Sequence, residues 1–257
     1  MRILVTNDDG INSIGIRTLI KVLARDHDVF IIAPDRERSA TGHSLTLHKP
    51  LRVEKVDLNI PNTTAWQTTG TPTDCVKLAM CSLLGSDQID LVVTGINHGP
   101  NLGADILYSG TVNAAIEGAI YSIPSIALSL TDGNFSEDDF KKASEFLLEF
   151  VRQLPGLNIP SQTILNINFP SGAEAELKNV EFTELGARNY CDCYEKRTDP
   201  RGKIYYWLAG EPIVEGEKET SDVMAIQRKL ISVTPIHFRL TDSELLHSLR
   251  KAFKHIT

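Results

Sequence analysis

The chain has 257 residues, which allows one large domain with a real core, or one domain with a sizeable appendage. Hydrophobic residues make up 42% of it and charged residues 23%, which excludes a disordered chain and a small disulfide scaffold. The 33 acidic residues outnumber the 26 basic ones, and the net charge of −7 opposes binding to nucleic-acid polymers and to anionic membranes. These figures favour a globular protein that acts on a small polar molecule.

No apolar run approaches the roughly 20 residues that a membrane-spanning helix needs. The first residues also lack the length and the small-residue cleavage site of a secretory signal. Four cysteines, Cys75, Cys81, Cys191 and Cys193, are too sparse for a disulfide framework. No second pair of cysteines or histidines stands near Cys191 and Cys193, so we expect structural thiols there rather than zinc ligands. We therefore expect a cytoplasmic protein.

Short apolar runs alternate with segments of helical periodicity along most of the chain. The runs show no polar alternation, which is typical of strands covered on both faces of a parallel sheet. They predict strands over residues 2–6, 29–33, 51–56, 65–68, 91–94, 125–130, 163–169, 205–208 and 230–234. The periodic segments predict helices over 16–23, 71–83, from 112 onward, over 137–153, and from 241 onward.

Two of these helices carry clear start signals. Thr71 is followed by Pro72 at the first helical position and by Asp74 at the third, which suits the exposed amides and the positive end of a helix. Thr241, with Glu244 three residues further on, has the spacing of a capping box. We expect Thr71 and Thr241 to be the N-caps.

The repeated βα units predict an α/β fold with a doubly wound, mainly parallel sheet and functional loops at the carboxyl ends of its strands. We expect a catalytic core over residues 1–179 and a closing strand and helix over 230–257. Residues 180–229 are predicted to form a β-hairpin arm around the aromatic cluster at 205–207. Because exposed aromatic side chains are costly, the arm and the terminal helix are expected to build an oligomer; a hairpin folded back onto its own core is the alternative.

Asp8 and Asp9 lie where the first predicted strand leaves the sheet, which is the edge at which open α/β folds bind ligands. Adjacent carboxylates repel each other, and a pair after a buried strand lowers stability unless a cation or hydrogen-bond donors neutralise it. A hard divalent ion such as Mg²⁺ or Mn²⁺ is the natural partner. The alternative is a solvated turn, since Asn-Asp-Asp-Gly is also favourable turn chemistry.

Two further loops carry groups that suit such a site. Ser39 and Asn97 also follow predicted strands and can offer neutral oxygens to a hard cation. Ser109, Gly110 and Thr111 stand at the start of a predicted helix, where free amides and the helix dipole favour a phosphate. Capping by Ser109 or Thr111 uses the same geometry, so both interpretations stay open.

Distinct motifs follow one another at residues 3–10 (ILVTNDDG), 33–44, 70–76 (GTPTDCV), 95–103, 108–112 (YSGTV), 166–170 (NINFP), 199–202 (DPRG), 205–208 and 231–235 (ISVTP). In this order they resemble the SurE family, the stationary-phase survival protein nucleotidases, over nearly the whole chain. The resemblance implies a Rossmann-like core and a divalent-metal-dependent phosphatase that hydrolyses nucleoside monophosphates. It also implies a homodimer or homotetramer with exchanged C-terminal elements.

The resemblance assigns roles by position, and the sequence departs from the family pattern at Ala40, where a glycine is common. The implied ligands of one Mg²⁺ or Mn²⁺ per subunit are Asp8, Asp9, Ser39 and Asn97, of which Asp8 and Asp9 are also the catalytic pair. The implied phosphate contacts are Asn97, Ser109, Gly110 and Thr111.

The proton chemistry stays open at this stage. Asp8 and Asp9 serve first as ligands, and a further role as general base or nucleophile does not follow from their type and spacing. His43 and His98 stand near the site in sequence and are candidates to protonate the leaving alkoxide; loop histidines are more commonly simple hydrogen-bonding residues. We expect 5′ nucleotides as substrates, leave 3′ nucleotides open, and exclude phosphodiesters and DNA.

Three rival functions fit less well. An aspartyl-phosphate phosphatase usually has two aspartates separated by one residue, whereas Asp8 and Asp9 are adjacent. A phospho-accepting receiver module needs an aspartate at the end of its third strand, whereas the corresponding strand of this chain continues into Gly95. Such a module is also only about half as long as this chain. A dinucleotide-binding oxidoreductase needs a glycine-rich turn after the first strand, which is missing.

Overall fold

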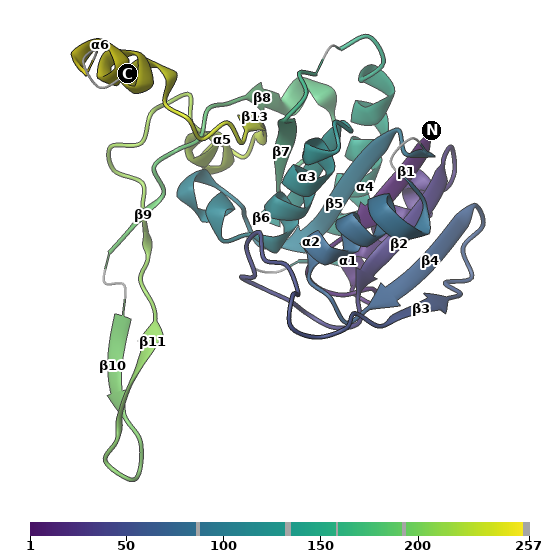
Figure 1. The fold of residues 1–257 in the computed structure, drawn as a ribbon, viewed down its shortest axis with the longest axis horizontal. Coiled ribbons are helices and arrows are strands. Elements are labelled where there is room, and N and C mark those ends of the chain that lie inside the picture. The colour runs from purple at the N-terminus through teal and green to yellow at the C-terminus, as the bar shows by residue number, and fades with distance from the viewer. Residues whose placement is uncertain (86–87, 132–134, 158, 192–193, 254–257) are drawn as a thin grey trace.

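The computed structural model describes residues 1–85, 88–131, 135–157, 159–191 and 194–253. Figure 1 shows a body built on one central sheet, a long arm that projects from one side of it, and a C-terminal helix that stands apart from the body. The predicted α/β class, with a Rossmann-like core, a projecting arm and a terminal helix, is confirmed. Among the helices described, none combines the length and apolar character needed to span a bilayer.

The central sheet has nine strands in the described part of the chain, in the order β3-β4-β2-β1-β5-β6-β7-β13-β8. From β4 to β7 all neighbours are parallel, while β3 pairs antiparallel with β4, and β13 pairs antiparallel with β7. The strands are β1 (Arg2–Thr6), β2 (Asp28–Pro34), β3 (Val53–Val56), β4 (Thr63–Thr68), β5 (Leu91–His98), β6 (Ser125–Thr131), β7 (Thr163–Pro170), β8 (Val180–Phe182) and β13 (Ile231–His237).

Helices cover both faces of the sheet, as a doubly wound fold requires. The apolar stripe of α1 and that of α4 pack with one face of the strands in the largest core cluster. Residues of α2 pack on the opposite face, and α3 also has its own apolar contacts with β6 and β7. The helices are α1 (Ile14–Leu23), α2 (Pro72–Leu78) with a π-helical extension (Ala79–Leu83), α3 (Gly110–Ile120), α4 (Glu137–Gln153), α5 (Asp222–Gln227) and α6 (Ser243–Ala252), with short 3-10 turns at Gly103–Leu107 and Leu177–Asn179.

Two predicted boundaries were wrong for identifiable reasons. β5 does not end at residue 94, because its backbone pairs with β6 beyond an irregularity between Gly95 and Asn97 and continues to His98. The terminal helix is capped by Asp242 and not by Thr241, since the Asp242 carboxylate accepts the main-chain N–H of Leu245 at 2.8 Å. The α2 start was predicted correctly: Thr71 and Asp74 form both bonds of a capping box.

The segment between β8 and β13 forms the arm and the turn back to the sheet. Two short antiparallel pairs build the arm, β9 (Asn189–Tyr190) with β12 (Pro212–Ile213) and, further out, β10 (Tyr194–Thr198) with β11 (Ile204–Leu208). Every residue of β10 and β11 is exposed, and the hairpin points away from the body (Figure 1).

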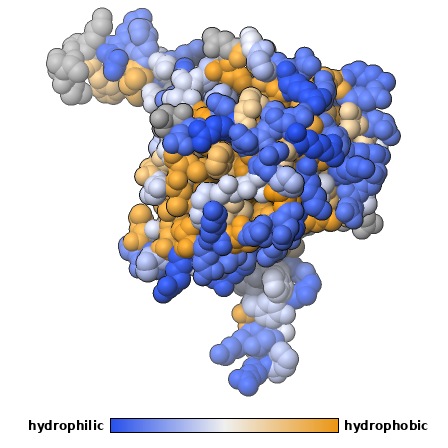
Figure 2. All heavy atoms as spheres, turned by 90° about the vertical axis from the view of Figure 1, so that its right-hand side faces the viewer, coloured by the Kyte–Doolittle hydropathy of each residue, from blue (hydrophilic) through white to orange (hydrophobic). Residues whose placement is uncertain are grey.

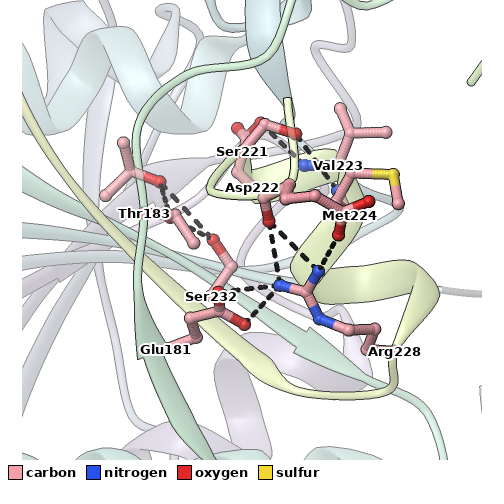
Figure 3. A network of polar contacts seen from close by, with 10 residues as sticks. Glu181, Thr183, Ser221, Asp222, Val223, Met224, Arg228 and Ser232 are labelled. Atoms are coloured by element: carbon pink, nitrogen blue, oxygen red, sulfur yellow. Dashed lines mark hydrogen bonds and ion pairs between the residues drawn. The ribbon is translucent and has the colours of Figure 1, made fainter. Parts of the chain in front are cut away.

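At the base of the arm, α5 is fixed to the sheet edge by polar contacts. Arg228, at the end of α5, donates to both carboxylate oxygens of Glu181 on β8, at 2.7 and 2.6 Å. Next to this pair the hydroxyls of Thr183 and Ser232 lie 2.9 Å apart (Figure 3). The arm therefore begins and ends at a well-anchored edge of the sheet.

Candidate active site

The candidate site lies at the carboxyl end of β1, where the strand order reverses. β1 pairs with β2 on one side and with β5 on the other, so the loops after β1 and β5 diverge and leave a crevice, as in other open α/β sheets. A cavity of about 370 Å³ occupies this position. It is lined by Asp8, Asp9, Glu37, Ser39, Ala40, Asn97, His98, Gly99, Pro100, Asn101, Asp105, Tyr108 and Ser109.

Asp8 is the more buried of the two carboxylates, with 5% of its surface exposed. Its Oδ1 accepts a hydrogen bond from the Thr111 hydroxyl at 2.7 Å, and its main-chain oxygen accepts the N–H of Arg38 at 2.7 Å. Burial raises the pKa of Asp8 to about 6, helped by the charge of Asp9 and opposed by the Thr111 hydrogen bond. The protein therefore holds Asp8 in place at an electrostatic cost that a cation would relieve.

Asp9 presents one oxygen without a protein partner. Its Oδ2 is buried and makes no hydrogen bond to any described residue, while its Oδ1 lies 3.9 Å from Nδ1 of His98. Burial raises the pKa of Asp9, and the interaction with His98 opposes that rise. A buried carboxylate oxygen without a donor is destabilising unless a ligand fills the position.

These observations fit a bound divalent cation. A hard cation would neutralise the two adjacent carboxylates, whose pKa values are both raised by burial. It would also give the unpartnered oxygen of Asp9 a ligand to bind. Among the described residues no three His, Cys, Asp or Glu side chains gather as a metal site. The remaining ligands would therefore be neutral oxygens, of the kind that Ser39 and Asn97 carry.

Ser39 and Asn97 both line the cavity beside the carboxylates. The Ser39 hydroxyl donates to Oε1 of Glu37 at 2.6 Å, which leaves its oxygen lone pairs to act as an acceptor. The Asn97 amide nitrogen donates to the main-chain oxygen of Gly99 at 2.9 Å, so the amide oxygen is the group left for a ligand. The structure thus brings together all four residues that the sequence suggested as cation ligands.

The loop that leads into α3 lies directly against Asp8. Ser109 caps the helix, since its hydroxyl accepts the N–H of Val112 at 3.1 Å, and Thr111 is wholly buried with its hydroxyl on Asp8. A Cβ on Gly110 would lie 3.1 Å from both Cβ and Oδ2 of Asp8, so a glycine suits this close approach. The Ser109 side chain therefore acts as the helix cap, as one of the two interpretations of this loop predicted. A phosphate contact by the loop stays a prediction.

The two candidate histidines have different surroundings. His98 lines the cavity, and its ring packs on Phe140 and Phe135 with ring centroids 4.9 and 5.8 Å apart. His43 instead lies 2.9 Å from Oε2 of the buried Glu117, which also binds Lys77. His98 is thus the histidine placed to meet a ligand, and His43 ties its loop to α3.

Ala40 has a backbone conformation that is unusual for its residue type. Its φ of +53° lies in the left-handed region that favours glycine. This is the position at which a glycine is common in the family that the sequence resembles. The loop therefore adopts the glycine-type conformation even though alanine stands there.

Two acidic residues that line the cavity, Glu37 and Asp105, were not predicted from the sequence. Glu37 lies within the motif at residues 33–44, and Asp105 lies in the 3-10 turn Gly103–Leu107, between two of the motifs. Nothing in the spacing of either residue separates it from a solvated surface acid. Of the cysteines, Cys75, Cys81 and Cys191 are free thiols, and Cys193 lies outside the described residues.

Comparisons with known proteins point to one family. The family profile described as Survival protein SurE matches residues 3–192. A protein named 5′-nucleotidase SurE from Syntrophomonas wolfei is 49% identical over 100% of this chain and 96% of its own, and one of the same name from Gloeobacter violaceus is 52% identical over 94% and 91%. The crystal structure of the SurE protein from Aquifex aeolicus matches with a TM-score of 0.85 and 38% identity, over 98% of this chain and 99% of that one. The chain therefore belongs to the SurE family.

Proposed function

We propose that this protein is a divalent-metal-dependent phosphatase that hydrolyses nucleoside monophosphates, a 5′-nucleotidase, to a nucleoside and phosphate. The observation that carries the proposal is the adjacent pair of carboxylates at the strand-order reversal: Asp8 is buried, Asp9 is partly buried, and one Asp9 oxygen has no partner among the described residues. The names of the relatives from Syntrophomonas wolfei and Gloeobacter violaceus support the same reaction.

Asp8, Asp9, Ser39 and Asn97 would hold one Mg²⁺ or Mn²⁺ per subunit. Such an ion, when bound, polarises a phosphoryl oxygen and lowers the pKa of a coordinated water. Asp8 is oriented for this role by Thr111, whose hydroxyl fixes one of its two oxygens.

The protein's own groups can then complete a phosphate site. The amino end of α3, beginning at Gly110, presents amides and the positive end of the helix dipole beside Asp8. His98, which lines the cavity with its Nδ1 3.9 Å from Oδ1 of Asp9, would give a proton to the departing alkoxide. These contacts involve a terminal phosphoryl group and do not inspect the base.

The expected selectivity follows from those contacts. Monophosphates of several nucleosides should be cleaved with similar efficiency, whereas a phosphodiester brings one charge fewer and a second bulky substituent. The net charge of −7 further opposes a polyanion such as DNA. We place the reaction in the cytoplasm, in keeping with the free thiols of Cys75, Cys81 and Cys191.

Phosphate release from a panel of purine and pyrimidine monophosphates, with Mg²⁺ or Mn²⁺ and with a chelator, tests the proposal. We expect turnover of several 5′ nucleotides that a chelator abolishes and that added metal restores. A dinucleotide serves as the diester control. Comparable cleavage of the dinucleotide, activity that survives the chelator, or restriction to a single base would contradict this description of the site.

We also propose that the protein is a homodimer or homotetramer. In α6 no residue is buried, and Leu245, Leu246, Leu249 and Phe253 lie along one side of the helix at the spacing of an apolar face. Figure 2 shows apolar residues on this helix, which protrudes from the body. A helix with that composition is expected to bury its face against a partner.

An apolar groove of about 440 Å³ beside β8 and β13 offers a surface for such a helix. Val180, Phe182 and Val233 line it, and Phe182 is 75% exposed. We infer that the groove receives α6 of a second copy, so that the C-terminal elements are exchanged between subunits. The aromatic hairpin β10–β11 would add a second contact between copies.

A further inference from the structure

The cavity carries an excess of negative charge, which would repel the nucleoside monophosphates proposed above as substrates. Four of its lining residues are acidic, Asp8, Asp9, Glu37 and Asp105, and none of the residues that line it is a lysine or an arginine. A nucleoside monophosphate is a dianion at neutral pH. One divalent cation at Asp8 and Asp9 offsets two of the four negative charges, so the charges of Glu37 and Asp105 would still repel the substrate unless another group neutralises them.

Asp105, one of these lining residues, is paired with a cation from a distant part of the chain. Nε of Arg188 donates to Oδ2 of Asp105 at 3.1 Å, and the Tyr190 hydroxyl donates to the same oxygen at 2.5 Å. The guanidinium carbon of Arg188 also lies 5.6 Å from the centre of the Tyr190 ring. Only 13% of the Arg188 side chain is exposed, so solvent screens this pair less than a surface ion pair.

The backbone around Arg188 is held in place from several sides. Its N–H and that of Ala187 donate to the two carboxylate oxygens of Glu217, at 2.7 and 3.0 Å. Arg188 itself has a φ of +52°, a conformation that a non-glycine residue keeps only where the surroundings enforce it. This root of the arm is therefore rigid and directs Arg188 toward the cavity wall.

Asp222, labelled in Figure 3 at the start of α5, joins the same segment to the cavity loop. Its carboxylate accepts the N–H of Gly103 at 2.9 Å and the N–H of Gly186 at 2.8 Å. A Cβ on Gly103 would lie 2.6 Å from the Gly186 oxygen, so the two backbones are in direct contact. The loop that carries Asp105 and the root of the arm are thus one packed unit.

We propose that Arg188 is a positioning residue for substrate binding, which acts through Asp105 by neutralising the acidic cavity wall so that a phosphate dianion can enter. This rests on the proposed function. The arm then contributes to the active site by supplying the cation at its root. Tyr190 shares the task, since its hydroxyl satisfies the same oxygen of Asp105.

A double-mutant cycle on the full chain tests the proposal. We would compare the wild type with R188Q, D105N and the double variant, measuring kcat and KM for one nucleoside monophosphate and the Kd of inorganic phosphate for the Mn²⁺-loaded protein by calorimetry. R188Q should raise KM and the phosphate Kd about tenfold, with kcat changed less than twofold, because a unit charge near a dianion is lost. D105N should lower both constants, and the double variant should return them close to the wild-type values.

The dependence on salt and a matched control variant distinguish an electrostatic effect of R188Q from a structural one. The difference between R188Q and wild type should shrink as the ionic strength rises from about 0.05 to about 0.5 M. The control, R25Q, removes an arginine from an ion pair with Glu145 at 2.6 Å, after the end of α1; it changes the net charge equally and should leave KM unaltered.

Three outcomes would overturn the inference: an unchanged KM in R188Q, a double variant as impaired as R188Q, or a difference independent of salt. If R188Q does not fold, R188K and D105N still decide, since R188K should keep most of the affinity and D105N should bind phosphate more tightly. A wild type without metal-dependent phosphatase activity would instead refute the proposed function, which distinguishes the two failures.

Discussion

The body and its two projections differ sharply in how they bury apolar surface. Every residue of β6, in the middle of the sheet, is buried, whereas every residue of β11 in the arm is exposed, with Trp207 59% and Leu208 76% accessible. The terminal helix α6 likewise buries nothing. Because apolar burial is the main driving force for folding, the body has the core that stability requires, whereas the exposed apolar side chains of the projections are those that the proposed oligomer would cover.

The comparison also shows that the two regions are not independent. The arm root is hydrogen-bonded through Asp222 to the loop that lines the cavity. Changes in the body away from this junction should alter catalysis and stability without changing the assembly, and changes in the exposed parts of the projections should alter the assembly first. Changes at the arm root should alter substrate binding.

The largest effect is expected from Asp9→Asn in the body. The variant removes a negative charge and the orphaned carboxylate oxygen from the proposed cation site, so activity and Mn²⁺ affinity should fall roughly a hundredfold or more. Asp8→Asn should behave likewise. Both proteins should keep the wild-type mass, and without metal their melting temperatures should be at least as high as that of the wild type, because each substitution removes a negative charge that burial disfavours.

Calorimetric titration of Mn²⁺ into each variant provides the measurement. Asp28→Asn, an exposed acid at the opposite end of the sheet, is the matched control and should bind like the wild type. Undiminished Mn²⁺ binding in both Asp8 and Asp9 variants would show that the metal assignment is wrong.

The next effect concerns the projections. Leu249→Glu on the apolar side of α6 should reduce the mass in solution measured by light scattering to that of a smaller species, because a charge on a buried interface costs several kcal/mol. Lys251→Glu, on the other side of the same helix, is the control and should leave the mass unchanged. A monomeric wild type refutes the exchange of terminal helices at once.

A smaller effect is expected for Asp139→Ala, which removes the N3 half of the capping box that Ser136 and Asp139 form at the start of α4. The Asp139 carboxylate accepts the main-chain N–H of Ser136 at 3.0 Å and that of Gly172 at 2.9 Å. Although burial alone would raise its pKa, hydrogen bonds from Ser136 and Gly172 hold it at about 2. The substitution should lower the free energy of unfolding by about 1 to 2 kcal/mol at neutral pH, measured by urea denaturation, without changing the mass.

The pH dependence of that loss has a defined sign. Since the pKa in the folded protein is depressed below the ordinary value of 3.8, the carboxylate stabilises the fold above about pH 4, and its contribution disappears as the pH falls toward 2. The stability difference between wild type and variant should shrink over that window. Asp138→Ala, next to it but 67% exposed and paired only with a surface lysine among the described residues, should cost less than about 0.5 kcal/mol.

The smallest effect is expected from Ala40→Gly in the cavity loop. Relief of the left-handed backbone should outweigh the greater flexibility of glycine in the unfolded chain and stabilise the protein by about 0.5 kcal/mol. Ala104→Gly, at an exposed position with an ordinary φ, should have the opposite sign. Equal destabilisation by both substitutions, in matched denaturant titrations, would argue against strain at Ala40.

Much of the body could be predicted from its sequence because local signals and tertiary contacts agree there. Unbroken apolar runs marked the parallel strands, and the cap at Thr71 fixed the start of α2. The carboxyl ends of those strands then placed Asp8, Asp9 and Asn97 near one another, as the cavity shows. Their roles as ligands stay predictions.

The parts that could not be predicted depend on contacts between distant segments. The continuation of β5 through Asn97 comes from pairing with β6, which no local pattern announces. Asp222 and Gly103 are 119 residues apart, and nothing in either segment indicates that one carboxylate joins them. The charge partner of Asp105 was missed for the same reason, because Arg188 belongs to a segment that looks like part of a separate arm.

The direction of the chain where the arm meets the body determines how the arm could be re-engineered. Glu184 and Ser221 form a parallel bridge, and parallel neighbours need a crossover of a dozen residues or more, so a tight turn cannot replace the whole arm. Further out, Tyr190 faces Pro212 in an antiparallel pair, which a two-residue turn can close. The hairpin beyond Tyr190 and Pro212 can therefore be replaced, and its length and tip redesigned, while Arg188 keeps its place beside Asp105.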